Sequence, residues 1–247
     1  MGKEIKIVIP SHLRYDRVKT TKAIANCIIC VPESQAALYK EYNKNTEVVA
    51  HPDSIIGLTP KRQWIYEHFG NVFQVDDDMT QMARVYTGKG EQTKVPKKLA
   101  YELIQQAGNI ANDMGVYLFA FSKSPMPTAF NPLKPLKLSG TVMGGAFGLL
   151  EGSKLHFNTD LILTEDYWVS GLNAHYHRMC YIDERFTFKF SNTFANKGGC
   201  ASYRTQQKEL EDTLKLKKYF GAAVELKKDT HLAKVKIAGS RTLKIPF

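Results

Sequence analysis

Short apolar segments alternate with helical patterns over the first 121 residues, and this alternation constrains the fold more than any other feature. The strand-like runs cover residues 5–10, 26–31, 48–50, 71–75 and 116–121. Segments with apolar residues at helical spacing separate them. Short connections between strands and helices are typical of a parallel sheet covered by helices. The sequence therefore predicts an α/β fold with a Rossmann-type, doubly wound, mostly parallel sheet, whose ligands bind beyond the carboxyl ends of the strands.

Capping signals place helices between these strands. Thr59 followed by Pro60 predicts a helix start, because a hydroxyl N-cap and a proline at the first position both favour one, and Gly70 ends that helix. Asp16 is expected to cap an earlier helix that runs through Ala25. The remaining helices of this half are expected over residues 33–42 and 96–115.

The second half of the chain has a different character. Residues 122–140 are basic, rich in proline and free of acidic residues, which predicts a long loop. The elements expected after it are a strand over residues 141–150, a helix from Thr164, a strand near residues 186–190, a Lys-rich helix over about 206–220 and an apolar segment at 232–237. No linker separates two cores, so one domain over residues 1–247 is expected, with an elaborated second half from residue 122.

Charge and cysteine usage narrow the class of protein. Lys and Arg number 34 against 24 Asp and Glu, a net charge of +10 that favours polyanionic partners such as nucleic acid. No apolar run approaches the ~20 residues of a membrane span, and no apolar signal segment precedes Ile5, so a soluble cytoplasmic protein is expected. Cys27 and Cys30 lie three apart on a predicted strand and face opposite sides, so we expect buried thiols, as for Cys180 and Cys200, and no shared metal.

Three adjacent acids, Asp76, Asp77 and Asp78, follow the strand at residues 71–75 directly. Adjacent carboxylates repel one another, so packing alone gives no reason for the cluster. Oxygen ligands hold Mg²⁺ or Mn²⁺, and such a metal neutralises the phosphates of a nucleotide diphosphate. This interpretation is favoured over the alternative, a solvated acidic turn that caps a helix from Met79.

Two basic segments accompany the acids. The loop at residues 10–17 follows the first strand, where a doubly wound fold binds nucleotides, and it carries Arg14 and Arg17. Lys61 and Arg62 occupy the first turn of a helix, which the helix dipole disfavours unless an anion shares the site. The alternatives are a polar turn and an exposed basic helix start. A G-x-G-x-x-G fingerprint and a Walker A loop are both absent from the sequence.

Glu165 and Asp166 begin the predicted helix after Thr164. One of the two could act as a general base that activates an acceptor hydroxyl. The alternative is purely structural, since acids suit the amino end of a helix and Thr164 suits its cap.

Together these segments resemble a known family. The order of I-V-I-P-S-H-L-R, G-L-T-P-K-R-Q-W, V-D-D-D-M and L-T-E-D-Y-W is similar to that of GT-A nucleotide-sugar glycosyltransferases, and most of all to the TET/JBP-associated glycosyltransferases. That group includes phage enzymes and the base J glucosyltransferase, which attach sugars to hydroxymethylated pyrimidines such as hydroxymethylcytosine in DNA. The resemblance covers roughly residues 5–205. It implies a GT-A-like fold with a nucleotide-sugar-binding half (1–121) and an acceptor-binding half (122–247).

The resemblance also implies roles for individual residues. The donor, a UDP-sugar by preference, would contact a set of residues at the strand ends: Pro10, Ser11, Arg14, Lys61, Arg62, Asp76 and Asp77. Asp78, with Asp76, would bind Mn²⁺ or Mg²⁺, and a C-terminal histidine, His231 before His177, would be a further ligand. Asp166, or else Glu165, would be the catalytic base.

An acceptor of DNA agrees with the net charge. Phosphate contacts are expected from Lys123, Lys134, Lys137 and Arg204, the last in a Gly-containing segment at residues 197–204. A base within a duplex would have to be flipped out to react. The leading hypothesis is therefore a metal-dependent, monomeric glycosyltransferase, located in the host cytoplasm if a phage encodes it. The alternatives are a glycosyltransferase that acts on a glycan or protein, and a nucleic-acid-binding domain without enzymatic activity.

Overall fold

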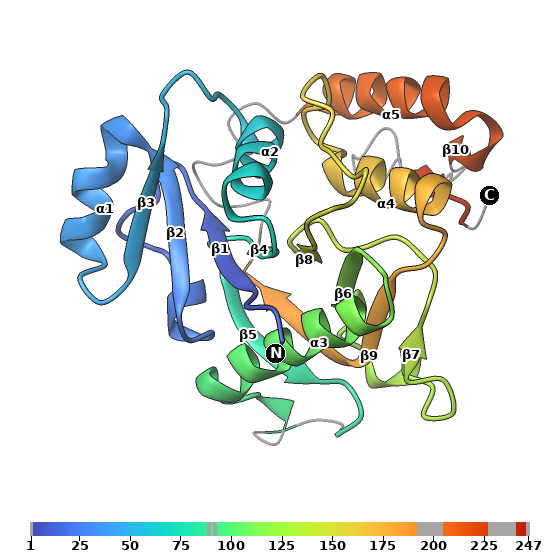
Figure 1. Cartoon of the computed structure of the whole chain (residues 1–247), viewed down its shortest axis with the longest axis horizontal. Coiled ribbons are helices and arrows are strands. Elements are labelled where there is room, and N and C mark those ends of the chain that lie inside the picture. The colour runs from blue at the N-terminus through green and yellow to red at the C-terminus, as the bar shows by residue number, and fades with distance from the viewer. Residues whose placement is uncertain (1, 88–89, 91–92, 192–204, 227–240, 246–247) are drawn as a thin grey trace.

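A nine-stranded sheet forms the centre of the protein in a computed structural model of the chain (Figure 1). The structure describes residues 2–87, 90, 93–191, 205–226 and 241–245. The sheet has the order β3-β2-β1-β4-β8-β6-β9-β5, with β7 beside β9, and β10 and β11 form a separate pair. The strands are β1 (Lys6–Pro10), β2 (Cys27–Pro32), β3 (Glu47–His51), β4 (Val72–Val75), β5 (Met79–Arg84), β6 (Leu118–Ser122), β7 (Leu136–Lys137), β8 (Ala146–Leu149), β9 (Tyr181–Phe190), β10 (Val224–Leu226) and β11 (Arg241–Leu243).

Most strands of the large sheet run in one direction. β1, β2, β3 and β4 run parallel to one another, and β6 is parallel to β9. β8 is antiparallel to both β4 and β6, so β6 and β9 have the same direction as β4. β5 and β7 run antiparallel to β9. This arrangement confirms the predicted α/β class with a mostly parallel sheet, compatible with a GT-A-like fold.

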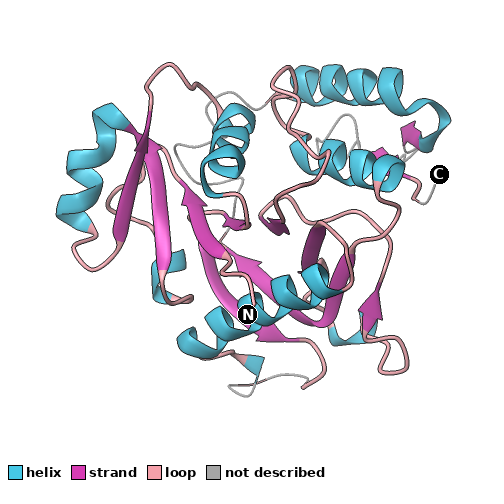
Figure 2. Ribbon diagram, in the orientation of Figure 1, coloured by secondary structure: helices cyan, strands magenta, loops and turns pink. Residues whose placement is uncertain are grey.

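Helices cover both faces of the sheet (Figure 2). They are α1 (Ala36–Tyr42), α2 (Leu58–Phe69), α3 (Lys97–Asp113), α4 (Glu165–Tyr176) and α5 (Gln206–Phe220), with short 3₁₀ turns at Thr20–Lys22, Glu33–Gln35, Pro127–Ala129 and Gly221–Ala223. One buried cluster joins α1 and α3 to the sheet, and a second joins α2, α4 and α5 to its opposite face. Successive strand residues alternate between the clusters, as the two-residue period of a strand requires. The apolar runs of the parallel strands are thus explained by burial on both faces.

The cysteines follow this alternation. Cys27 belongs to the cluster under α1 and α3, whereas Cys30 belongs to the cluster under α2 and α4. Both thiols are free, as is that of Cys180, and burial raises the pKa of Cys27 and of Cys30 to about 12. The predicted inert, buried thiols are confirmed at these three positions. Cys200 lies outside the described residues.

Two local predictions are wrong. The helix expected from Asp16 to Ala25 is absent from that described segment, where only the turn at Thr20–Lys22 forms. The helix predicted at Thr59 has Gly57 as its N-cap instead, and the Thr59 hydroxyl is buried without a hydrogen-bond partner among the described atoms. The alternative interpretation of Asp76–Asp78, an acidic turn that caps a helix from Met79, is also wrong, because residues after Asp78 form the strand β5 paired with β9.

A helix that crosses a membrane has to be both long and apolar, and none of the described helices combines the two properties to the extent required.

Candidate active site

The acidic turn Asp76–Asp78 connects β4, near the middle of the sheet, to β5 at its edge. Its backbone is fixed by hydrogen bonds from other segments of the chain. The bonds run from Asp76 N to Gly145 O (2.9 Å), from Thr20 Oγ1 to Asp76 O (2.5 Å), from Lys19 N to Asp77 O (2.8 Å) and from Ser191 N to Asp78 O (3.0 Å). The three carbonyl groups and the Asp76 N–H are therefore bonded within the protein, which fixes the path of the backbone that carries the three carboxylates.

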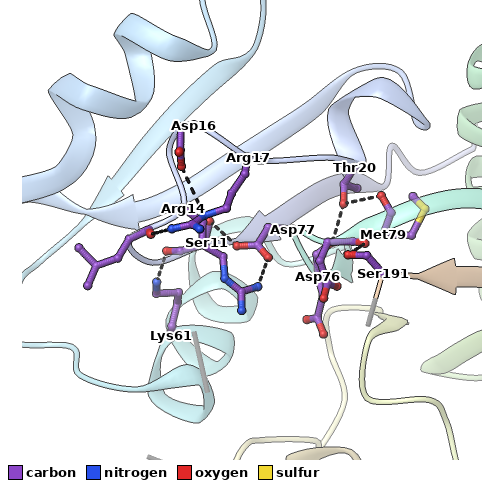
Figure 3. A network of polar contacts seen from close by, with 12 residues as sticks. Ser11, Arg14, Asp16, Arg17, Thr20, Lys61, Asp76, Asp77, Met79 and Ser191 are labelled. Atoms are coloured by element: carbon purple, nitrogen blue, oxygen red, sulfur yellow. Dashed lines mark hydrogen bonds and ion pairs between the residues drawn. The ribbon is translucent and has the colours of Figure 1, made fainter. Parts of the chain in front are cut away.

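Asp77 is joined to the loop after β1 (Figure 3). Its carboxylate accepts hydrogen bonds from Ser11 Oγ (2.6 Å) and from the Arg14 guanidinium (2.6 Å). The Tyr39 hydroxyl accepts from Arg14 N at 2.9 Å and lies 2.7 Å from Ser11 Oγ. Lys61 Nζ donates to Ser11 O at 2.5 Å. The geometry therefore brings Ser11, Arg14, Lys61 and Asp77 together beside Pro10, the last residue of β1, as the sequence indicates.

Asp78 differs from its neighbour. The residue is 5% exposed, yet neither carboxylate oxygen has a hydrogen-bond partner within the described part of the chain. Burial and the negative charge of Asp77 raise the pKa of the Asp78 carboxyl. A buried carboxylate without a partner is costly for a fold. Such a group is suited to bind a cation.

A cage of protein ligands for a metal is not formed by the described residues. Among them, no group of three or more His, Cys, Asp or Glu side chains has a metal-binding arrangement. His231 lies outside the described residues, and His177 is at the opposite end of α4 from Glu165, where its ring accepts from Lys154 N. Mg²⁺ commonly binds through one or two carboxylates together with substrate phosphates and water. Asp78 fits that mode of binding.

Arg62 joins the acidic turn to the start of α4. Its side chain is fully buried, and one guanidinium nitrogen donates to Asp76 Oδ1 (2.8 Å) and to Gly144 O (2.7 Å). Its Nε lies 3.4 Å from Glu165 Oε1, and Cζ lies 5.2 Å from the centre of the Phe147 ring. Burial and the neighbouring carboxylates raise the pKa of Asp76 to about 7, although the positive charge of Arg62 opposes this. Arg62 is therefore an internal ion-pair partner, and the interpretation as an exposed basic helix start is wrong for it.

Asp166 is oriented by its own helix and by the segment before β8. Its Oδ1 accepts the Tyr167 N–H at 2.9 Å, and a Cβ placed on Gly144 would lie 3.1 Å from its Oδ2. Burial raises the pKa of the Asp166 carboxyl, while Arg241, Lys123 and Arg62 lower it in that order of strength. A carboxylate with a raised pKa can accept a proton from a substrate hydroxyl near neutral pH. Asp166 has this property, whereas Glu165 is 5% exposed and paired with Arg62.

The residues predicted to contact DNA are in three different situations. Lys123 Nζ donates to Thr141 Oγ1, and Lys137 forms an ion pair with Glu184 at 3.2 Å. The Lys134 side chain is exposed, and its backbone N–H donates to Asn131 O, which closes a turn. Arg204 and the rest of residues 197–204 lie outside the described residues, since the description stops at 191 and resumes at 205. Of the three lysines, Lys134 therefore has the character expected of a freely exposed phosphate contact.

Sequence reasoning missed several residues of the site. Tyr39 follows a helical apolar pattern, which gives no sign that its hydroxyl reaches the β1 loop. Gly144 reads as part of a strand, and its close approach to Asp166 is a tertiary feature. Arg241 and Asp212, which contact the α4 region from the C-terminal segment, are more than 45 residues away in the sequence. The predicted Thr164 cap occupies the right position but forms no side-chain hydrogen bond to the helix.

A comparison with protein-family models identifies the chain. The model of the TET-Associated Glycosyltransferases matches residues 5–199, which include the acidic turn, the β1 loop and the start of α4. The chain belongs to this TET-associated glycosyltransferase family. The family predicted from the sequence is thereby confirmed, and its name marks glycosyl transfer as the activity associated with TET/JBP-type base modification. No curated protein sequence matches the chain. The family match ends before α5, β10 and β11.

Proposed function

We propose that this TET-associated glycosyltransferase transfers a sugar from a nucleotide-sugar donor, by preference a UDP-sugar, to the hydroxymethyl group of a pyrimidine base in DNA. The observation that carries the proposal is the Asp78 carboxylate, which is buried, raised in pKa and without a partner among the described residues. Family membership supports glycosyl transfer, and this carboxylate supports a cation-assisted departure of the donor diphosphate.

The donor would occupy the carboxyl end of the sheet. In this arrangement, the diphosphate lies near Asp78, within reach of the positive charges of Arg14 and Lys19, both of which lower the pKa of that carboxyl. Asp78 would hold a bound Mn²⁺ or Mg²⁺, which would neutralise the negative charge that develops on the diphosphate. The second Asp76 oxygen lies on the same turn, while its first oxygen remains with Arg62.

Asp166 would act as the base. As the acceptor hydroxyl oxygen forms its bond to the anomeric carbon, the bond from that carbon to the phosphate oxygen breaks and the nucleoside diphosphate leaves. The hydroxyl proton moves to the Asp166 carboxylate. Glu165 is a positioning residue in this scheme, because its pairing with Arg62 holds the start of α4 against the acidic turn.

DNA as the acceptor is supported by charge. The chain carries a net charge of +10, and the loop at residues 122–140 contains lysines without acids. Neutralised phosphates release counterions, so a basic surface favours binding of nucleic acid. A target base within a duplex would be flipped out before transfer.

The test is a direct assay of transfer. The full chain is incubated with Mn²⁺, a panel of nucleotide sugars and hydroxymethylated DNA, and the nucleosides are then analysed by mass spectrometry. The expected result is a modified hydroxymethylpyrimidine whose mass has increased by one sugar. The matched control is the same DNA without hydroxymethyl groups.

Two results would replace the proposal. Donor hydrolysis without modification of DNA would favour a glycan or protein acceptor. Salt-sensitive binding of DNA with no turnover of any nucleotide sugar would favour a binding domain without enzymatic activity.

A further inference from the structure

A C-terminal unit formed by α5, β10 and β11 packs against α4, the helix that begins with Glu165 and Asp166 (Figure 1). Leu216, Val224 and Leu243 from this unit lie in the same buried cluster as Val169 and Leu172 of α4. The unit follows the segment that the family model matches. Its contacts with α4 therefore involve residues that the family match does not cover.

The first contact fixes the chain just before α4. Asp212 of α5 is 1% exposed, and its Oδ2 accepts the N–H groups of Ile162 and Leu163, both at 2.7 Å. These two residues precede Thr164, the N-cap of α4. One buried carboxylate from the C-terminal unit thus binds two backbone donors at the point where the helix starts, a strong arrangement because the acceptor is charged.

The second contact involves Arg241 of β11. Its guanidinium donates to Glu209 Oε2 (2.9 Å) and to Thr213 Oγ1 (2.9 Å), both on α5. Its Cζ lies 4.9 Å from the centre of the Tyr167 ring. The Arg241 side chain is only 10% exposed. The guanidinium is therefore held by one helix and placed over an aromatic ring of the other, a geometry in which a cation is attracted to the ring face.

Tyr167 transmits this contact to Asp166. Its backbone N–H donates to Asp166 Oδ1 at 2.9 Å. The ring that Arg241 covers and the backbone donor that orients the Asp166 carboxylate therefore belong to the same residue. Displacements of about 1 Å at a reacting group can reduce a rate by up to about 10²-fold.

We propose that Arg241 is a positioning residue for the base Asp166, and that the α5–β10–β11 unit contributes to the acceptor side of the site. This inference rests on the proposed function. Arg241 acts through Tyr167 and through its charge, while Asp212 fixes the start of the same helix.

Charge gives the proposal a distinctive readout. Among the described residues, the charged groups that act on the Asp166 carboxyl are Arg241 from β11, Lys123 after β6 and Arg62 from α2, and Arg241 has the strongest effect of the three in lowering the Asp166 pKa. Burial acts in the opposite direction. The titratable Tyr167 also interacts with this carboxyl, and burial together with that interaction raises the Tyr167 pKa. Removal of the Arg241 charge should therefore raise the pKa of Asp166, so that the carboxylate is protonated at a higher pH than in the unmodified protein.

The test measures kcat against pH for the full chain and for Arg241→Gln, Arg241→Lys and Lys244→Gln, using the donor and DNA of the transfer assay. Lys244→Gln is the matched control, because Lys244 forms an exposed ion pair with Glu225 beside β11. We expect Arg241→Gln to lower kcat about 10-fold or more at pH 7, to move the acidic limb of the kcat profile to higher pH, and to leave the donor KM unchanged. Arg241→Lys should keep the position of the limb, and Lys244→Gln should match the unmodified chain.

Other outcomes would overturn the proposal. A kcat that falls equally at every pH in Arg241→Gln, with an unmoved acidic limb, would mean a merely structural role. If Arg241→Gln does not fold, the Arg241→Lys variant decides: an acidic limb displaced from that of Lys244→Gln, although the positive charge is kept, would contradict the role of the charge. An unmodified chain that transfers no sugar would instead refute the proposed function, so the two failures are distinguishable.

Discussion

The acidic turn after β4 and the first turn of α4 have similar arrangements of carboxylates and arginines. Each contains adjacent carboxylates, and in each an internal arginine binds at least one carboxylate while another is left available. Asp77 is paired with Arg14 at 2.6 Å, whereas the Asp78 carboxylate has no hydrogen-bond partner among the described residues. Glu165 is paired with Arg62 at 3.4 Å, whereas the Asp166 carboxylate accepts only a backbone N–H in the described contacts. Adjacent acids therefore differ in their surroundings according to the arginine that reaches them.

The two regions differ in what supports them. The turn after β4 is held by residues within the matched family segment, through Gly145, Lys19, Thr20 and Ser191. The start of α4 depends on side chains from the C-terminal unit, which lies outside that segment. The proposed donor side thus lies within the segment that the family model matches, whereas the proposed acceptor side also has contacts with residues of the C-terminal segment.

The largest effect is expected from a substitution in the acidic turn, on the proposed donor side. Asp78→Asn should abolish sugar transfer and donor binding in the presence of Mn²⁺, because it removes the only unpartnered buried carboxylate of the described turn. Its free energy of unfolding at pH 7 should be equal to or above that of the unmodified chain. The sign follows from linkage: a carboxyl whose pKa is raised by folding binds protons more tightly in the folded state, so its contribution falls as pH rises through the folded pKa. Isothermal titration measures donor binding, and denaturant unfolding measures the free energy of unfolding.

The matched variant on the same turn is Asp77→Asn. It should lower the free energy of unfolding by about 3 kcal/mol, because it removes the buried carboxylate that pairs with Arg14. Transfer close to that of the unmodified chain by Asp78→Asn, or full activity in metal-free buffer, would contradict the proposed cation site.

The next effect concerns the acceptor side. Asp166→Asn should retain donor binding and lower kcat by about 10²–10⁴-fold, the usual contribution of a positioned base. Because the pKa of Asp166 is raised and the proposed mechanism uses its carboxylate form, kcat of the unmodified chain should fall as pH decreases through that pKa. Steady-state kinetics over a pH series measure this.

Glu165→Gln tests which of the two acids at the start of α4 is the base. It should affect stability more than kcat, because the Glu165 side chain pairs with buried Arg62. A loss of about 10²-fold or more in kcat from Glu165→Gln alone, with Asp166→Asn still active, would reverse the assignment of the two acids.

A smaller effect is expected at Gly144, which touches both regions. Its carbonyl accepts from Arg62, and an added Cβ would lie 3.1 Å from Asp166 Oδ2. Gly144→Ala should therefore displace the carboxylate and lower kcat by roughly 10–10²-fold without changing donor affinity. In the Asp166→Asn background the same substitution should have little further effect. Independent losses that multiply in the double variant would count against this coupling.

The smallest effect distinguishes the lysines of the 122–140 loop. Replacing Lys123, Lys134 and Lys137 with Ala should raise the KM for DNA and flatten the dependence of log K on log salt, by about 0.9 for each phosphate that is no longer neutralised. Nucleotide-sugar affinity should stay nearly unchanged. Lys134→Ala should account for more of this change than Lys137→Ala, because Lys137 is paired with Glu184. Equal salt slopes for the triple variant and the unmodified chain would direct the DNA path elsewhere.

The sequence allowed the order of most strands and helices to be predicted, because burial on both faces leaves continuous apolar runs and capping residues mark the ends. It could not indicate that β8 runs antiparallel between β4 and β6, since an apolar run carries no sign of its direction. The expected helix after Asp16 fails because Arg14 and Lys19 are committed to Asp77, which holds this segment as an irregular loop.

The sequence singled out the candidate site residues but not the side chains that they contact. Asp76–Asp78 form an acid cluster at a strand end, and Glu165–Asp166 form an acidic helix start. Which carboxylate each arginine binds depends on contacts across 14 to 103 positions, as between Arg62 and Asp76 or Glu165. Arg241 and Asp212 had no local signal, because they act through the packing of α5 and β11 on α4.

The fixed backbone of the acidic turn has a thermodynamic consequence. Because hydrogen bonds to distant segments hold Asp76–Asp78 in place, the carboxylates cannot separate to relieve their repulsion, and a bound cation meets a site that needs little rearrangement. The same bonds connect the turn to the segments that flank β8, β9 and β2. Ligand binding should therefore raise the melting temperature of the whole molecule rather than cause a local movement. At a ligand concentration 100 times Kd the stabilisation amounts to about 2.7 kcal/mol.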